Sequence, residues 1–142
     1  MTGPLVVDAG ALFAQADVDD PDHQAVVDVL RAERRPLVTS QLAVAEADYL
    51  IMTRLGVEVE LAFLDDLTGG TFDAEALTGE DFGVTRDLVR RYRDLEIGAA
   101  DASLVVLAHR HRTRRLLTLD ERCFRAISPL QGGSFQLLPH DA

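Results

Sequence analysis

The stretch LEIGAADASLVVLAHRHRTRRLLTLD, residues 95–120, predicts a helix and the buried strand that follows it. Small residues at 98–100 indicate that the backbone approaches a neighbour closely where the helix begins. The almost wholly apolar run after Asp101 predicts a helix buried against a sheet. A basic turn then leads into 114–119, a short apolar run typical of a buried parallel strand.

The geometry of this unit brings two acidic residues to the same edge of the sheet. A helix that covers a parallel sheet runs antiparallel to its strands, so its N-terminus lies near their carboxyl ends. A helix of ~12 residues rises ~18 Å, and ~5 strand residues return ~16 Å. We therefore expect Asp101, in the first helical turn, to meet Asp120, at the end of the strand, where open α/β sheets bind ligands.

The rest of the chain continues this alternation of strands and helices. We expect strands at 5–7, 36–39, 71–73 and 135–138, and helices at 21–33, 41–55, 57–67, 78–94 and 121–126. A tight turn at Gly10 is expected before a short first helix, and Ser40 and Thr78 are expected N-caps. The pattern predicts one α/β domain over 1–142, with a mostly parallel central sheet and helices on its faces.

Composition excludes several functions. The formal charge of −10 argues against non-specific nucleic-acid binding. All 14 basic residues are arginine, so there is no P-loop lysine, Schiff-base lysine or phospho-receiver lysine. No apolar run approaches the ~20 residues of a membrane span. The single cysteine cannot form an internal disulfide, and we expect a cytoplasmic protein.

Four acidic residues fall at strand ends or helix beginnings: Asp8, Glu46, Asp101 and Asp120. Taken alone, Asp8 is a helix cap and Glu46 an exposed glutamate, although the small apolar residues around Glu46 favour burial. Carboxylates ~4 Å apart repel by roughly 4 kcal/mol at an effective dielectric of 20, so a cluster needs protons or a cation. Hard oxygen ligands suit Mg²⁺ or Mn²⁺, and the matching chemistry is phosphodiester hydrolysis.

Four motifs carry a family resemblance: VVDAGALFA (6–14), VAEADYL (44–50), IGAADASLVVLA (97–108) and LLTLDERCF (116–124). With these motifs in this order, the chain resembles the PIN-domain ribonucleases of the VapC type, which are the toxins of type II toxin–antitoxin systems. The resemblance runs over nearly the whole sequence. The resemblance implies a three-layer α/β/α PIN fold over 1–142. It also implies Mg²⁺-dependent endonuclease cleavage of tRNA or ribosomal RNA, a homodimer, and inhibition by a cognate VapB-type antitoxin.

The family pattern implies an acidic metal site of Asp8, Glu46, Asp101 and Asp120, with Thr118 as a polar helper. We expect Asp8 and Asp101 to bind the metal directly, Asp120 to hold it or a second ion, and Glu46 to act through water. One position departs from the pattern, because Gly10 stands where the family often has a hydroxyl residue.

Arginines at the far end of the same helix are candidates for phosphate contact: Arg110, Arg112, Arg114 and Arg115. Their distance from Asp101 leaves roles at a dimer, at an antitoxin or in salt bridges equally open. An alternative from another class is a non-catalytic α/β binding module whose acids are structural. A folded protein that binds no metal would favour that alternative.

Overall fold

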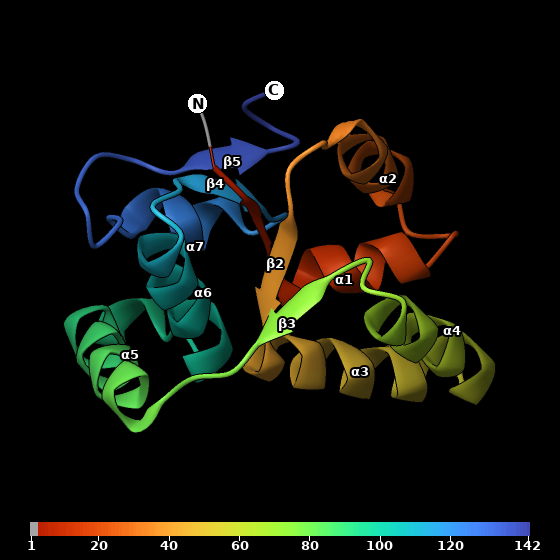
Figure 1. The fold of residues 1–142 in the computed structure, drawn as a ribbon, viewed down its shortest axis with the longest axis horizontal. Coiled ribbons are helices and arrows are strands. Elements are labelled where there is room, and N and C mark those ends of the chain that lie inside the picture. The colour runs from red at the N-terminus through yellow and green to blue at the C-terminus, as the bar shows by residue number, and fades with distance from the viewer. Residues whose placement is uncertain (1–2) are drawn as a thin grey trace.

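A five-stranded, wholly parallel sheet forms the centre of the molecule in the computed structural model, which describes residues 3–142 (Figure 1). Its strands are β1 (Leu5–Val7), β2 (Leu37–Ser40), β3 (Asp73–Glu75), β4 (Arg115–Leu117) and β5 (Gln136–Leu138). Their order across the sheet is β3-β2-β1-β4-β5. With helices on both faces, this confirms the three-layer α/β/α architecture with a parallel sheet.

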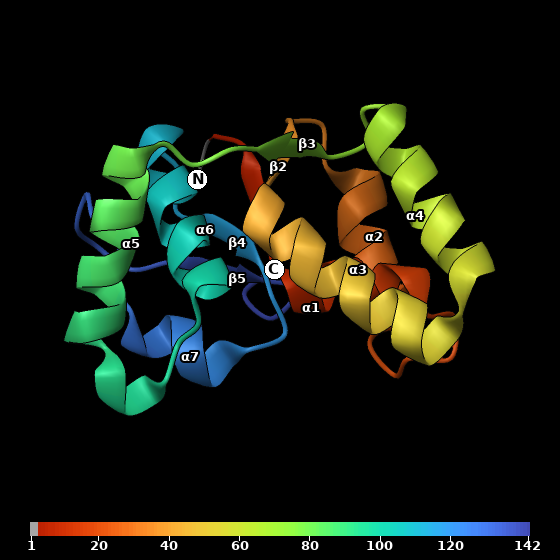
Figure 2. The same cartoon turned by 90° about the horizontal axis from the view of Figure 1, so that it is seen from below.

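Helices connect the strands at the expected places. They are α1 (Ala9–Ala16), α2 (His23–Ala32), α3 (Gln41–Leu55), α4 (Val57–Thr68), α5 (Gly79–Arg91), α6 (Ala99–Arg110) and α7 (Glu121–Ala126), with a 3-10 turn η1 (Arg93–Leu95). The Ser40 hydroxyl accepts the Ala43 N–H, and Thr78 forms a capping box with Asp81, so both expected caps are confirmed. Seen from below, α4 lies beside α3 and α5 beside α6 (Figure 2).

The central strand β1 places the next residue, Asp8, at a switch in the topology. Val6 pairs with Val38 of β2 on one side and with Leu116 of β4 on the other. The chain first leaves β1 for β2 and only later returns to the opposite side as β4. Open α/β sheets bind ligands at the carboxyl edge of such a switch point, and Asp8 follows β1 at that edge.

Helix α6 is the most deeply buried helix, as its apolar sequence predicts. Every residue from 102 to 108 is buried, and the helix packs along β1 and β2 and against α3 and α5. Its start is therefore held rigidly against the sheet, and with it Asp101. No helix within residues 3–142 is long and apolar enough to cross a membrane.

Two local expectations are wrong. Gly10 makes no turn, because α1 begins at Ala9, directly after the capping side chain of Asp8. The strand expected at 71–73 begins only at Asp73 and runs to Glu75 as β3. On α3 the inward face is made by Ala43, Ala47 and Ile51, whereas Tyr49 is exposed. The small alanine side chains on this face let α3 pack closely against its neighbours. Close packing therefore decides which face of α3 turns inward, and larger side chains remain on the outer faces.

Candidate active site

Asp8 is buried at the carboxyl end of β1, with only 5% of its surface exposed. Its Oδ1 accepts the backbone N–H of Ala11 at 2.7 Å and so caps α1. Its Oδ2 accepts a hydrogen bond from the hydroxyl of Thr118. The interpretation of Asp8 as a helix cap therefore does not exclude a role in a site, because the capping carboxylate also lies at the carboxyl edge of the sheet.

Thr118 joins two of the acids. Its backbone N–H bonds to the carbonyl of Leu138 in β5 at 3.0 Å, which fixes the residue beside the sheet. Its hydroxyl donates to Asp8 and accepts the backbone N–H of Asp120 at 3.0 Å. Thr118 thus sets the position of Asp8 relative to the turn that carries Asp120.

Asp120 lies in that turn and not in the strand, which corrects the expectation that it ends the strand. Strand β4 stops at Leu117, and Asp120 is the N-cap of α7, where Oδ1 accepts the Cys123 N–H at 3.1 Å. Asp120 is exposed. The physical reason is the turn at Thr118, whose side-chain bond to the Asp120 N–H ends the extended backbone two residues earlier.

Asp101 and Glu46 come from two helices that a buried pair of hydroxyls locks together. Ser40, the cap of α3, and Ser103 of α6 lie 2.6 Å apart at their Oγ atoms, and Ser103 donates to the carbonyl of Ala100 at 2.5 Å. Both serines are fully buried. Sequence reasoning assigned Ser40 to a cap but did not detect its link to Ser103.

Glu46 itself is exposed, so the expected burial is wrong. Consecutive residues of a helix point about 100° apart. Because the side chain of Ala47 faces inward, that of Glu46 points toward solvent at the rim of the site.

The four acids nevertheless converge. Asp8, Glu46, Asp101 and Asp120 all line a single open cavity of about 440 Å³, together with Ala9, Gly10, Leu50 and Leu119. They come from the end of β1, from α3, from α6 and from the start of α7. Residues as much as 112 positions apart in the chain (8 to 120) thus share one pocket at the carboxyl edge of the sheet.

The pKa values of two of the acids are raised in the cavity. Burial raises the pKa of Asp8 to about 7; the hydrogen bonds from Thr118 and Ala11 oppose the rise, and the charges of Asp101 and Asp120 add to it. Burial, followed by the charges of Glu46 and Asp120, raises the pKa of Asp101 to about 6. Both carboxylates therefore hold protons more tightly than free aspartate does, and a cation relieves the same repulsion.

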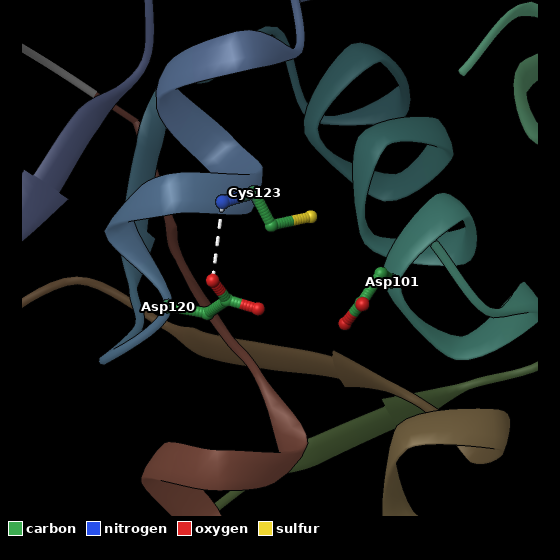
Figure 3. Close-up of side chains that lie close together, drawn as sticks. All are labelled: Asp101, Asp120 and Cys123. Atoms are coloured by element: carbon green, nitrogen blue, oxygen red, sulfur yellow. Dashed lines mark hydrogen bonds between the residues drawn. The ribbon is translucent and has the colours of Figure 1, made fainter. Parts of the chain in front are cut away.

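Cys123 lies beside this cavity and lines a smaller pocket of about 100 Å³ with Leu95, Asp120 and Arg122, although its only use in the sequence was to exclude a disulfide. It is 8% exposed, and its Sγ and one carboxylate oxygen each of Asp101 and Asp120 lie within 4.8 Å of one another. The three side chains point toward a common space between α6 and the start of α7 (Figure 3). Its spacing of three from Asp120 was the signal in the sequence, since N-cap and N3 side chains lie together on a helix.

The arginines at the other end of α6 lie away from the acids. Arg110 pairs with Glu75 and Asp81, Arg114 donates to the carbonyl of Gly132, and Arg115 pairs with Glu33. The remaining one, Arg112, is exposed. About nine residues separate Asp101 from Arg110, a rise of roughly 14 Å along the helix, so these arginines do not touch a phosphate held between the acids of the same protomer.

Comparison with known proteins agrees with this geometry. The family model described as PIN domain matches residues 5–128. The chain belongs to the PIN domain family. Ribonuclease VapC26 of Mycobacterium tuberculosis is 43% identical to it over 135 residues, which is 95% of this chain and the whole of that relative.

A solved structure has a similar fold. It is the crystal structure of VapC20 from Mycobacterium tuberculosis, described as a sarcin-ricin loop cleaving toxin. The TM-score is 0.77 over 82% of this chain and 90% of that chain, at 15% sequence identity. At this identity the likeness concerns the fold alone, and it confirms the PIN-like arrangement of sheet and helices.

Proposed function

We propose that this PIN-domain protein is a Mg²⁺-dependent endoribonuclease and the toxin of a VapBC-type pair, cleaving structured RNA such as tRNA or ribosomal RNA. The observation that carries the proposal is the cavity in which Asp8, Glu46, Asp101 and Asp120 converge. The 43% identity to a relative named as a ribonuclease supports the choice of RNA as substrate.

The donor set fits a hard divalent ion. Asp8 keeps Oδ2 oriented by Thr118, while within residues 3–142 no hydrogen bond ties down the carboxylate of Asp101. We assign direct contact with the ion to these two residues, and a supporting contact or a second ion to Asp120. Mg²⁺, or Mn²⁺ in its place, takes a few carboxylate oxygens and leaves positions for water and phosphate oxygens. When bound, it activates a water molecule and stabilises the attacking and leaving oxygens of the phosphodiester.

The protein's own residues hold this chemistry in place. Thr118 keeps Asp8 and Asp120 at a fixed separation, and the Ser40–Ser103 contact fixes the start of α6 against that of α3. The exposed position of Glu46 suits a residue that orients water at the rim and does not bind the ion directly. The open shape of the cavity suits a long substrate that passes across its mouth.

We further propose that the protein forms a homodimer and is held inactive by a VapB-type antitoxin. Val57, Leu61 and Leu64 are exposed, and their spacing of four and three residues places them on one face of α4. Exposed apolar side chains gathered on one face are typical of surfaces that meet another chain. The names of the two VapC relatives support the antitoxin as a partner.

The proposal extends to the whole chain as a single PIN domain acting in the cytoplasm. Residues beyond 128 support this extent, because β5 pairs with β4 in the same sheet and its Leu138 carbonyl binds Thr118. Among Arg110, Arg112, Arg114 and Arg115, we assign Arg112 to phosphate contact, because it is exposed and its side chain makes no hydrogen bond or ion pair within residues 3–142.

The test is to incubate the purified protein with tRNA and ribosomal RNA and to sequence the ends produced. We expect discrete cuts with Mg²⁺, no cuts with EDTA, and none from Asp101→Asn. Asp19→Asn, an exposed acid in the loop before α2, is the matched control and should cut normally. Equal cutting with and without EDTA would contradict the proposal.

A further inference from the structure

The sulfur of Cys123 lies near two of the four acids, Asp101 and Asp120. The side chain is more than nine-tenths buried, and within residues 3–142 no hydrogen bond uses its Sγ. Figure 3 shows the sulfur directed from the start of α7 toward the space in front of Asp101. An unpartnered polar atom aimed at two carboxylates differs from a thiol that only fills the core.

We propose that Asp101, Asp120 and Cys123 form a site for a thiophilic divalent cation of the Zn²⁺ class, which shares two carboxylates with the proposed Mg²⁺ site and adds a sulfur ligand. Each residue offers one ligand atom, and the three atoms lie within 4.8 Å of one another. Tetrahedral Zn²⁺ with oxygen and sulfur ligands needs ligand atoms about 3.4–3.6 Å apart, as follows from bond lengths of roughly 2.1 and 2.3 Å. The three ligand atoms therefore need to move toward one another when the ion binds.

The surrounding contacts favour this arrangement. One oxygen of Asp120 is fixed by the Cys123 N–H, which leaves the other free and holds the two ligands on the same helical turn. Three protein ligands leave a fourth position for water. Binding breaks the S–H bond of Cys123 and forms a metal–sulfur bond, and the proton passes to solvent. Mg²⁺ avoids sulfur, so the thiol discriminates between the two ions.

The site has a consequence for the proposed reaction. Zn²⁺ held by Asp101 and Asp120 withdraws two of the four carboxylates from Mg²⁺. We therefore expect low Zn²⁺ concentrations to inhibit RNA cleavage. This consequence rests on the proposed ribonuclease function, whereas the site itself rests only on the geometry of the three side chains.

The experiment uses the full-length, metal-free protein and Co²⁺, which replaces Zn²⁺ and reports thiolate ligation by a charge-transfer absorption in the near ultraviolet. Cys123 is the only cysteine in the chain, so such a band identifies it directly. We expect the band in the wild type, a weaker band in Asp120→Asn, and no band in Cys123→Ser. Calorimetry should show the Zn²⁺ Kd of Cys123→Ser raised by about tenfold or more, with the Mg²⁺ Kd changed by less than about twofold.

The outcomes are separable. Co²⁺ binding without a charge-transfer band in the wild type overturns the site, and so does a band that Asp120→Asn leaves unchanged. If Cys123→Ser does not fold, the wild-type spectrum and Asp120→Asn still decide. RNA cleavage plays no part in these measurements. A protein without ribonuclease activity would therefore leave the cation site standing, and a protein without the cation site would leave the proposed ribonuclease function standing.

Discussion

The hydroxyl of Thr118 donates a hydrogen bond to Oδ2 of Asp8 and accepts one from the Asp120 N–H. Thr118→Val keeps the shape of the side chain and removes both bonds. Loss of a group that orients a ligand typically costs 10–100-fold in metal affinity or activity, so we expect losses of about that size in Mg²⁺ affinity and kcat/KM. Titration calorimetry and initial rates measure them. Thr118→Ser keeps the hydroxyl and should stay close to wild type.

The buried contact of Ser103 with Ser40 joins the helices that carry Asp101 and Glu46. Ser103→Ala leaves the O–H of Ser40 without its acceptor in a fully buried position, although Ser40 Oγ still accepts the Ala43 N–H. An unsatisfied buried group costs about 1–3 kcal/mol, so we expect the free energy of unfolding in urea to fall by that amount. Ser128→Ala, at an exposed residue, is the control and should change it by less than about 0.5 kcal/mol. A neutral Ser103→Ala would show that the contact does not hold the helices.

The pKa of Asp8 couples stability to pH in the metal-free protein. Burial raises it from 3.8 to about 7 in the native state. Between these values the native state binds more protons than the unfolded state, so this residue lowers the free energy of unfolding as the pH rises from about 4 to about 7. Asp8→Asn lacks this dependence. We therefore expect Asp8→Asn to become more stable relative to the wild type across this range, measured by thermal unfolding in EDTA; a constant difference would contradict the burial effect.

Arg112 is exposed and lines a second cavity, of about 560 Å³, together with His109, Arg110, Arg114 and Gln131. If it contacts an RNA phosphate, Arg112→Gln should weaken binding of all RNAs alike. It should also reduce the slope of log affinity against log salt by about 1. The control is Arg86→Gln, an exposed arginine of α5. Equal slopes for both variants would remove Arg112 from the RNA contacts.

The fold was largely predictable because its signals are local. Ser40, Thr78 and Gly56 mark helix ends through side-chain caps and a positive φ, and they do so at the residues expected. The buried run of α6 is apolar on every side, which only a helix covered by other elements tolerates. Gly10 was misjudged because a glycine was taken as a turn, although α1 accommodates it in its first turn.

The site was predictable only in part. Asp8, Asp101 and Asp120 follow from the rule that the carboxyl ends of parallel strands share an edge. The exposure of Glu46 and the Ser40–Ser103 contact depend on how helices rotate when they pack, which pattern and spacing do not encode. At Gly10, an added Cβ would lie 3.6 Å from Oδ1 of Asp8, an ordinary contact. The backbone at Gly10 therefore has room for an alanine beside Asp8.

The most direct test of the central claim is Mg²⁺ binding and RNA cleavage measured on the same samples of wild type, Asp8→Asn and Asp101→Asn. We expect the wild type to bind Mg²⁺ and cut RNA, and both variants to fold, to bind Mg²⁺ at least about tenfold more weakly and to lose cleavage. Folded variants that bind Mg²⁺ and cut RNA as the wild type does would show that the acid cavity is not the catalytic centre.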